Sequence, residues 1–268
     1  MPEPAQPPAG GTYEVIAVRY GTRTSAKSEN YLNYHLYGEP DADVTMAYYF
    51  WIARNADRTV VIDTGFDTAV GVRRGRTSLI EPRYALTALG VDTVDQVVAT
   101  HGHYDHIGNL DLFPTAEVVV DRREYEFWHG PYGDRLLFAA PTELAELRQL
   151  TAIRDEGRLT LTGERHDVAP GIEAVRVGGH TPGQLVVTVA TADGTAILAS
   201  DAVHFYEEYE LGRPFSVIAD LEEMYRAYDL LAEMSQDRGR VLIAGHDPAD
   251  ADRFGLVDPS FDFALRIG

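Results

Sequence analysis

The sequence contains no cysteine, which excludes disulfides, thiolate metal sites and a cysteine nucleophile. Any bound metal must therefore be held by histidine and carboxylate side chains. Basic residues are also scarce, because 23 Lys plus Arg stand against 42 Asp plus Glu, a formal net charge of −19 over 268 residues. Such a surface repels phosphate backbones and anionic lipid headgroups, so neither nucleic acid nor a membrane surface is an expected partner.

Long apolar runs are missing as well. The longest, at 47–53, is far shorter than the roughly 20 residues that cross a bilayer. The opening segment 1–11 lacks the basic start and apolar stretch of a secretory signal, and we expect it to be a flexible N-terminus. Hydrophobic residues make up 45% of the chain, enough for a sizeable core. We expect a cytoplasmic protein with one domain over residues 12–268.

Two halves of the chain share one pattern of short strands that end in polar turns. Strands are predicted at 12–20, 45–53, 59–62, 96–99 and 117–120, with helices at 82–89, 122–128 and 141–150. The second half repeats the pattern with strands at 172–177, 185–190, 196–198 and 241–244. A helix over 220–234 carries apolar residues three and four apart, which indicates one buried face. The acidic segment 220–237 is also a candidate homodimer surface.

Histidines follow several of these predicted strands. The tightest cluster is HGHYDH at 101–106, directly after the strand at 96–99. Alternate residues of an extended segment point the same way, so His101 and His103 can bind one ion while Asp105 and His106 face another.

Each of two such ions would still lack ligands, since a zinc site needs about four. His180 stands in the turn GGHTPG at 178–183, Asp201 ends a strand, and His246 follows the last predicted strand. An ionised Asp201 has two acceptor oxygens and can bridge both ions. The predicted sets are His101, His103, His180 and Asp201 for one ion, and Asp105, His106, His246 and Asp201 for the other. Zinc is the expected metal, with iron, manganese and cobalt as alternatives.

HGHYDH followed by GGHTPG, ASD and AGHD resembles the metallo-β-lactamase fold superfamily over about residues 13–247. The resemblance implies an α/β fold, a four-layer αβ/βα sandwich of two mixed β-sheets face to face with helices outside. It also implies a dinuclear metal site along one edge. Within that family the aspartate of VIDTG, here Asp63, supports a metal ligand through a hydrogen bond.

The N-acyl homoserine lactonase-like branch is the most similar in length and motif order. This implies a metal-dependent hydrolase that opens a lactone or cleaves a related small-molecule ester, as in quorum quenching, with Asp105 handling the proton. Those lactonases usually carry a tyrosine three residues after the bridging aspartate. Here that position is His204, which can donate the same hydrogen bond, and Tyr206 is a second candidate for contacting the substrate. Three alternatives stay open: a thioesterase of the hydroxyacylglutathione type, a mononuclear iron persulfide dioxygenase, and a non-catalytic metal-binding member.

Overall fold

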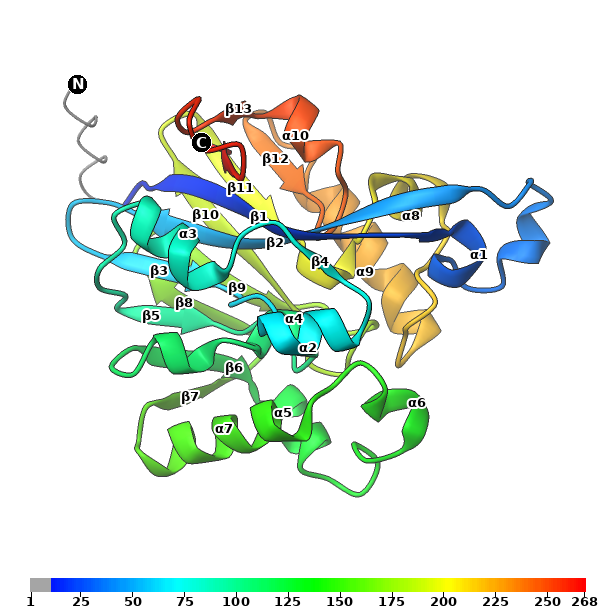
Figure 1. The fold of residues 1–268 in the computed structure, drawn as a ribbon, viewed down its shortest axis with the longest axis horizontal. Coiled ribbons are helices and arrows are strands. Elements are labelled where there is room, and N and C mark those ends of the chain that lie inside the picture. Colours follow the sequence, from blue (N-terminus) through cyan, green and yellow to red (C-terminus); the bar gives the residue numbers. More distant parts are fainter. Residues whose placement is uncertain (1–10) are drawn as a thin grey trace.

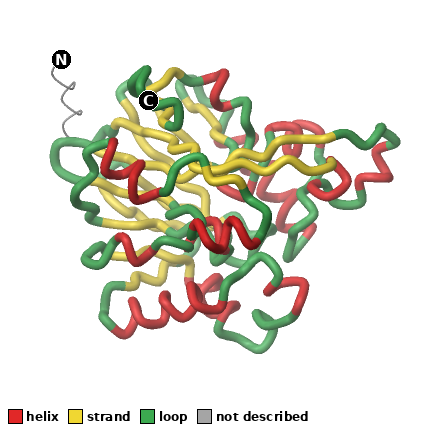
Figure 2. The backbone as a smooth tube through the Cα atoms, in the orientation of Figure 1, coloured by secondary structure: helices red, strands yellow, loops and turns green. Residues whose placement is uncertain are grey.

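The computed structural model describes residues 11–268, so the prediction of a flexible N-terminus falls almost wholly outside the described residues. Two β-sheets form the centre of the molecule, and helices lie on their outer sides (Figures 1 and 2). None of the helices in residues 11–268 is long and apolar enough to cross a membrane.

The larger sheet is mixed and has the order β13-β14-β1-β2-β3-β5-β6-β7, with β4 added beside β1. Strands β3, β5, β6 and β7 run parallel, whereas the pairs around β1 and β2 are antiparallel. Its strands are β1 (Glu14–Ala26), β2 (Asp43–Arg54), β3 (Thr59–Ile62), β4 (Thr77–Ser78), β5 (Gln96–Val98), β6 (Glu117–Asp121), β7 (Leu159–Thr162), β13 (Gly255–Leu256) and β14 (Ala264–Arg266).

The smaller sheet has the order β12-β11-β10-β9-β8 and is also mixed, because only β11 and β12 pair in parallel. Its strands are β8 (Arg165–Ala169), β9 (Ile172–Arg176), β10 (Leu185–Thr191), β11 (Gly194–Leu198) and β12 (Arg240–Ile243). The antiparallel pairing of β10 with β9 and β11 places the segments that follow β9, β11 and β12 near one edge.

The helices are short apart from α7 and α9. They are α1 (Lys27–Asn30), α2 (Thr68–Arg73), α3 (Pro82–Ala88), α4 (Tyr104–Ile107), α5 (Arg122–Trp128), α6 (Leu136–Ala139), α7 (Leu144–Asp155), α8 (Tyr206–Leu211), α9 (Leu221–Met234) and α10 (Asp250–Arg253). Three 3₁₀ turns are η1 (Tyr34–Tyr37), η2 (Leu110–Leu112) and η3 (Ser200–Ala202).

Alternation along the strands divides the core into layers. On β1, Val15 and Ala17 pack in the cluster between the two sheets, together with Val187 of β10. Ile16 and Val18 point to the opposite face, into a cluster that also contains residues of α3, α5 and α7. A third cluster packs α9 through Met224 and other apolar residues onto the smaller sheet. The layers are helix, sheet, sheet and helix, which confirms the predicted α/β sandwich.

Most predicted elements are present within a few residues, and three differences have physical reasons. Strand β1 continues to Ala26 rather than ending near residue 20, because β2 pairs with it along its whole length. Strands β7 and β8 were not predicted, since β7 (LTLT) is only four residues long and β8 (RHDVA) begins with polar residues that show no clear alternation. The helix expected at 141–150 is α7, which begins later, after Glu143, and ends at Asp155. The apolar face predicted for 220–234 packs on its own sheet.

Candidate metal centre

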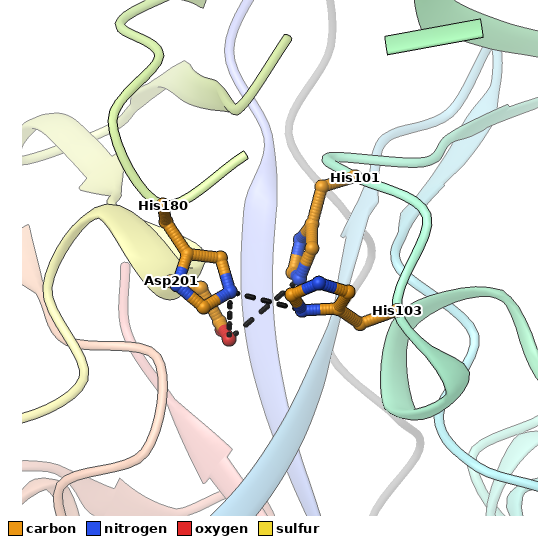
Figure 3. A group of neighbouring side chains, drawn as sticks. All are labelled: His101, His103, His180 and Asp201. Carbon is orange, nitrogen blue, oxygen red and sulfur yellow. Dashed lines mark hydrogen bonds and ion pairs between the residues drawn. The ribbon is translucent and has the colours of Figure 1, made fainter. Parts of the chain in front are cut away.

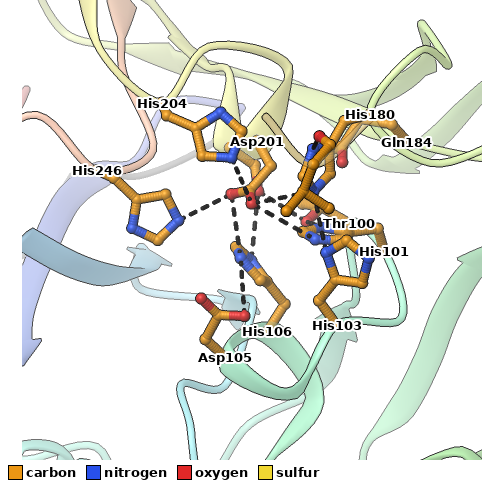
Figure 4. Close-up of polar contacts among 12 residues, drawn as sticks. Thr100, His101, His103, Asp105, His106, His180, Gln184, Asp201, His204 and His246 are labelled. Atoms are coloured by element: carbon orange, nitrogen blue, oxygen red, sulfur yellow. Dashed lines mark hydrogen bonds and ion pairs between the residues drawn. The ribbon is translucent and has the colours of Figure 1, made fainter. Parts of the chain in front are cut away.

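The seven side chains predicted as metal ligands lie together at one edge of the two sheets, on segments that follow strands (Figure 4). The first half supplies four of them from the segment after β5 and from α4, and the second half supplies three from the segments after β9, β11 and β12. All are buried. Their ligand atoms form two groups, each within 4.8 Å: His101, His103, His180 and Asp201 in one, and Asp105, His106 and His246 in the other.

The first group converges from three segments, with His180 and Asp201 facing His101 and His103 (Figure 3). Nε2 of His180 lies 3.0 Å from Nδ1 of His103 and 3.3 Å from Oδ2 of Asp201. Nε2 of His101 lies 3.6 Å from the same oxygen of Asp201. The His180 loop needs glycine: Gly179 has φ +85°, and a Cβ there would come within 2.6 Å of the Met224 Cα.

Asp201 faces both groups at once. Its Oδ1 lies 2.9 Å from Nε2 of His246 and 3.1 Å from Nε2 of His106, whereas its Oδ2 faces the first group. Asp105 approaches the second group through Oδ1, which is 3.8 Å from Nε2 of His106. This is the arrangement that a carboxylate bridging two ions requires.

The outward-facing nitrogens of three rings already have acceptors. Nδ1 of His180 donates to the Val217 carbonyl oxygen, and Nδ1 of His246 donates to that of Ala47, both at 2.8 Å. Nδ1 of His106 lies 2.8 Å from Oδ2 of Asp63. With the ring proton on the outer nitrogen, each inner Nε2 presents a lone pair to the cluster.

These inner lone pairs converge on one another and on the Asp201 oxygens, an arrangement that is repulsive without a cation between them. In addition, Nε2 of His101 and of His106 are buried without a hydrogen-bond partner among the described residues. The donor set of imidazole nitrogens and carboxylate oxygens therefore fits two divalent ions.

Burial lowers the pKa of His101, His103 and His180, because it disfavours the imidazolium form. For Asp201, burial acts in the opposite direction, but the surrounding histidines, His106 foremost, hold its pKa well below the usual range. Neutral imidazoles and an ionised carboxylate are the forms that bind a metal.

Asp63 contacts the ligand cluster from behind, and its own backbone is in a strained turn. It directly follows β3 and has φ +61°, a left-handed conformation that aspartate tolerates better than most residues. Besides facing His106, its carboxylate accepts the backbone N–H of Thr100 at 2.8 Å and the Ser200 hydroxyl at 3.1 Å. The Asp63 carboxylate thus joins the segments that carry His101, His106 and Asp201. Its position agrees with the supporting role implied by the family resemblance.

Sequence reasoning missed Glu124 of α5, a buried carboxylate behind the cluster that bonds to the two loops carrying its histidines. Its carboxylate accepts the backbone N–H groups of Gly102 at 2.8 Å and Gly183 at 2.9 Å, and the indole N–H of Trp128 at 2.6 Å. Gly102 lies between His101 and His103, and Gly183 follows the His180 turn. Burial raises the pKa of Glu124. No local motif marks it, because its two backbone partners, Gly102 and Gly183, are 22 and 59 residues away.

His204 lies beside the cluster, at its predicted place three residues after Asp201. Its Nε2 is 3.0 Å from Oδ2 of Asp201, and its ring stacks on Phe215 with centroids 3.8 Å apart. The buried Glu208 accepts the backbone N–H of His204 at 3.0 Å and faces its Nδ1 at 3.3 Å. Burial lowers the pKa of His204, but the carboxylates of Asp201 and Glu208 outweigh it and raise the pKa to about 10.

Tyr206 points away from the cluster, which corrects the expectation that it contacts substrate. Its hydroxyl donates to Oδ1 of Asp250 at 2.5 Å and lies 3.2 Å from the Leu242 carbonyl oxygen. It does not line the cavity above the metal ligands, because the α8 helix that begins at Tyr206 turns its side chain toward β12 and α10.

A cavity of about 110 Å³ opens over the cluster. Asp105, Asp201 and His204 lie in its wall, together with several residues that the sequence had not singled out. These are Arg23, Glu29, Met46, Tyr48, Arg76, Tyr104, Pro141, Phe215, Ser216 and Val217. The cavity thus combines aromatic and apolar surface with two arginines.

The family model of the metallo-beta-lactamase superfamily matches residues 42–246, and the chain belongs to this superfamily. A metallo-beta-lactamase domain-containing protein 1 of Xenopus laevis is 29% identical over 71% of this chain and 66% of its own length. An N-acyl homoserine lactonase of Azorhizobium caulinodans is 26% identical over 60% of this chain and 62% of its own length. These matches thus span less than two thirds of either relative.

A solved structure with the same fold is a dizinc quorum-quenching lactonase in complex with a product. It has 18% sequence identity and a TM-score of 0.69, with 91% of this chain and 90% of that chain covered.

Proposed function

We propose that this chain is a dinuclear metal-dependent hydrolase that opens a lactone or cleaves a related carboxylic ester, with zinc as the metal. The observation that carries the proposal is the position of Asp201, whose two oxygens face two separate groups of ligand atoms. Superfamily membership and the similarity to N-acyl homoserine lactonases support the choice of an ester substrate.

In this proposal His101, His103 and His180 would hold one ion, Asp105, His106 and His246 would hold the other, and Asp201 would contribute to both. When bound, two divalent ions lower the pKa of a water molecule and polarise the ester carbonyl. Asp105, in the cavity wall, accepts the proton of the attacking water and returns it to the leaving oxygen. No side-chain nucleophile is needed.

His204 is assigned the hydrogen-bond donor to the substrate oxygen. Its ring forms part of the cavity wall, and Phe215 and Glu208 hold the ring in place on one face and at Nδ1. A donor fixed before the reaction stabilises the developing negative charge without reorganisation. Tyr48 and Met46 supply apolar surface for the remainder of the substrate.

The test is metal content per chain by elemental analysis, followed on the same sample by a pH-indicator screen of lactones with and without an acyl-amide tail. Two zinc-like ions with acid release are expected. Free thiol from thioesters without lactone opening would indicate the thioesterase instead. One iron with oxygen uptake on a persulfide would overturn hydrolysis, and metal without any activity would leave a structural role.

A further inference from the structure

One arginine of the cavity wall, Arg76, forms no ion pair with a carboxylate among residues 11–268, although the negative charge of Asp105 helps to raise its pKa. Arg76 lies between α2 and β4, and its backbone N–H donates to the Gly71 carbonyl oxygen at 2.8 Å. The pairing of β4 with β1, at Thr22 with Thr77, fixes this segment on the larger sheet. The Arg76 side chain, half-buried, reaches the cavity that opens over the metal ligands.

The guanidinium is held in one orientation without being neutralised. Its Nε donates to the Tyr104 hydroxyl at 2.8 Å, and its Nη1 donates to the Arg74 carbonyl oxygen at 2.6 Å. The rings of Tyr104 and Tyr48 lie 5.7 and 5.8 Å from it. Among residues 11–268 no carboxylate forms an ion pair with Arg76, and its Nη2 donates no hydrogen bond.

Every acidic group of the cavity wall has another partner. Glu29 pairs with Arg23 at 2.6 Å, and Asp105 and Asp201 belong to the proposed metal centre. The neighbouring Arg74 is different from Arg76, because it pairs with Glu143 at 2.9 Å and does not line the cavity. Of the two arginines in the cavity wall, Arg23 is therefore paired with a carboxylate and Arg76 is not.

We propose that Arg76 binds an anionic carboxylate carried by the substrate, so that the preferred substrate is a lactone or ester with a free carboxylate outside the scissile bond. The proposal rests on the proposed function and adds the substrate class. Three guanidinium N–H groups are left, one on Nη1 and two on Nη2, and adjacent N–H groups on the two nitrogens suit a planar carboxylate. A site screened by two aromatic rings strengthens the charge-assisted bond.

Binding is tested separately from hydrolysis. The probes are two five-membered lactams, which resist opening: one has a ring carboxylate and the other has a neutral carboxamide at the same carbon. Isothermal titration of the metal-loaded protein is expected to give tighter binding of the carboxylate by roughly 10- to 100-fold, the range of one charge-assisted hydrogen-bond pair. Arg76→Gln should abolish this preference, and Arg76→Lys should retain part of it.

Arg73→Gln is the matched control, since Arg73 is a neighbouring arginine that pairs with Glu143 at 2.9 Å and does not line the cavity, and it should keep the preference. Equal binding of the two lactams by the unmodified protein would overturn the proposal. So would a preference that survives Arg76→Gln with the melting temperature unchanged, because the carboxylate would then bind the metal centre directly.

The corresponding pair of lactones then tests hydrolysis. Carboxylate-selective binding without lactone opening would contradict the proposed function alone, whereas opening of both lactones at equal kcat/KM would contradict only the role of Arg76.

Discussion

The carboxylate of Asp63 lies 2.8 Å from Nδ1 of His106, and the same carboxylate accepts a hydrogen bond from Thr100. One side chain at the end of β3 therefore orients a ring on α4 and anchors the segment that leads to His101. The strained φ of +61° at Asp63 is maintained by these bonds.

Asp63→Asn should weaken metal binding while the chain still folds. Asparagine tolerates the left-handed conformation, but it offers only one acceptor oxygen. Its NH₂ group would face one of the donors that now bond to the Asp63 carboxylate. Loss of a hydrogen bond of this kind typically lowers metal affinity by about 10- to 100-fold. Competition with a chromophoric chelator measures the change. Asp67→Asn, at the start of α2, is the control and should leave the affinity unchanged.

Glu124→Gln should destabilise the protein and loosen the metal centre together. Both carboxylate oxygens of Glu124 accept backbone N–H groups, so an amide must turn a donor toward one of them. The cost of an unsatisfied buried donor is about 1–3 kcal/mol. Urea unfolding and chelator competition on the same variant report the two effects. Glu126→Gln, at an exposed position of the same helix, should change neither the unfolding free energy nor the metal affinity. If Glu124→Gln also left both unchanged, the buried hydrogen bonds of Glu124 would be dispensable.

His204→Ala should lower kcat for lactone opening by roughly 100-fold, the usual effect of removing one fixed hydrogen-bond donor from the reacting oxygen. Metal content should be unchanged, which separates this role from that of a ligand. Tyr206→Phe is the neighbouring control: kcat should be retained, but about 1 kcal/mol of stability should be lost with the bond to Asp250. A drop in kcat for Tyr206→Phe alone would reverse the assignment.

Asp250 should make stability depend on pH. Burial raises the pKa of Asp250 to about 7 from an ordinary value of 3.8, so the folded chain holds a proton that the unfolded chain has released between these values. Stability therefore falls as pH rises through this window. Asp250→Asn removes this pH dependence. The unfolding free energy of the variant minus that of the unmodified protein should therefore rise by roughly 2–4 kcal/mol between pH 4 and pH 8. The exposed Asp252→Asn should show no such trend.

The sandwich was implied by the resemblance to the superfamily, whereas the strands and the ligand cluster could be predicted from local signals. Strand alternation separates the two faces of a sheet, and a strand that ends in His or Asp delivers that side chain to the sheet edge. Glu124 and Arg76 could not be predicted in the same way. Glu124 contacts Gly183, 59 residues away, and the exposure of Arg76 to the cavity depends on how β4 pairs with β1. Tyr206 was misjudged because its hydroxyl is engaged by Asp250 and the Leu242 carbonyl oxygen, which are both distant in sequence.

Four of the seven clustered side chains come from the chain before β6, and three come from the chain after β9. Neither portion alone can surround an ion, and each of the two groups draws on both portions. The cluster therefore also holds the two portions of the chain together. A chain cut between β7 and β8 would recover tight metal binding only when its two fragments reassemble, so metal affinity would serve as a gauge of how correctly the two sheets have docked.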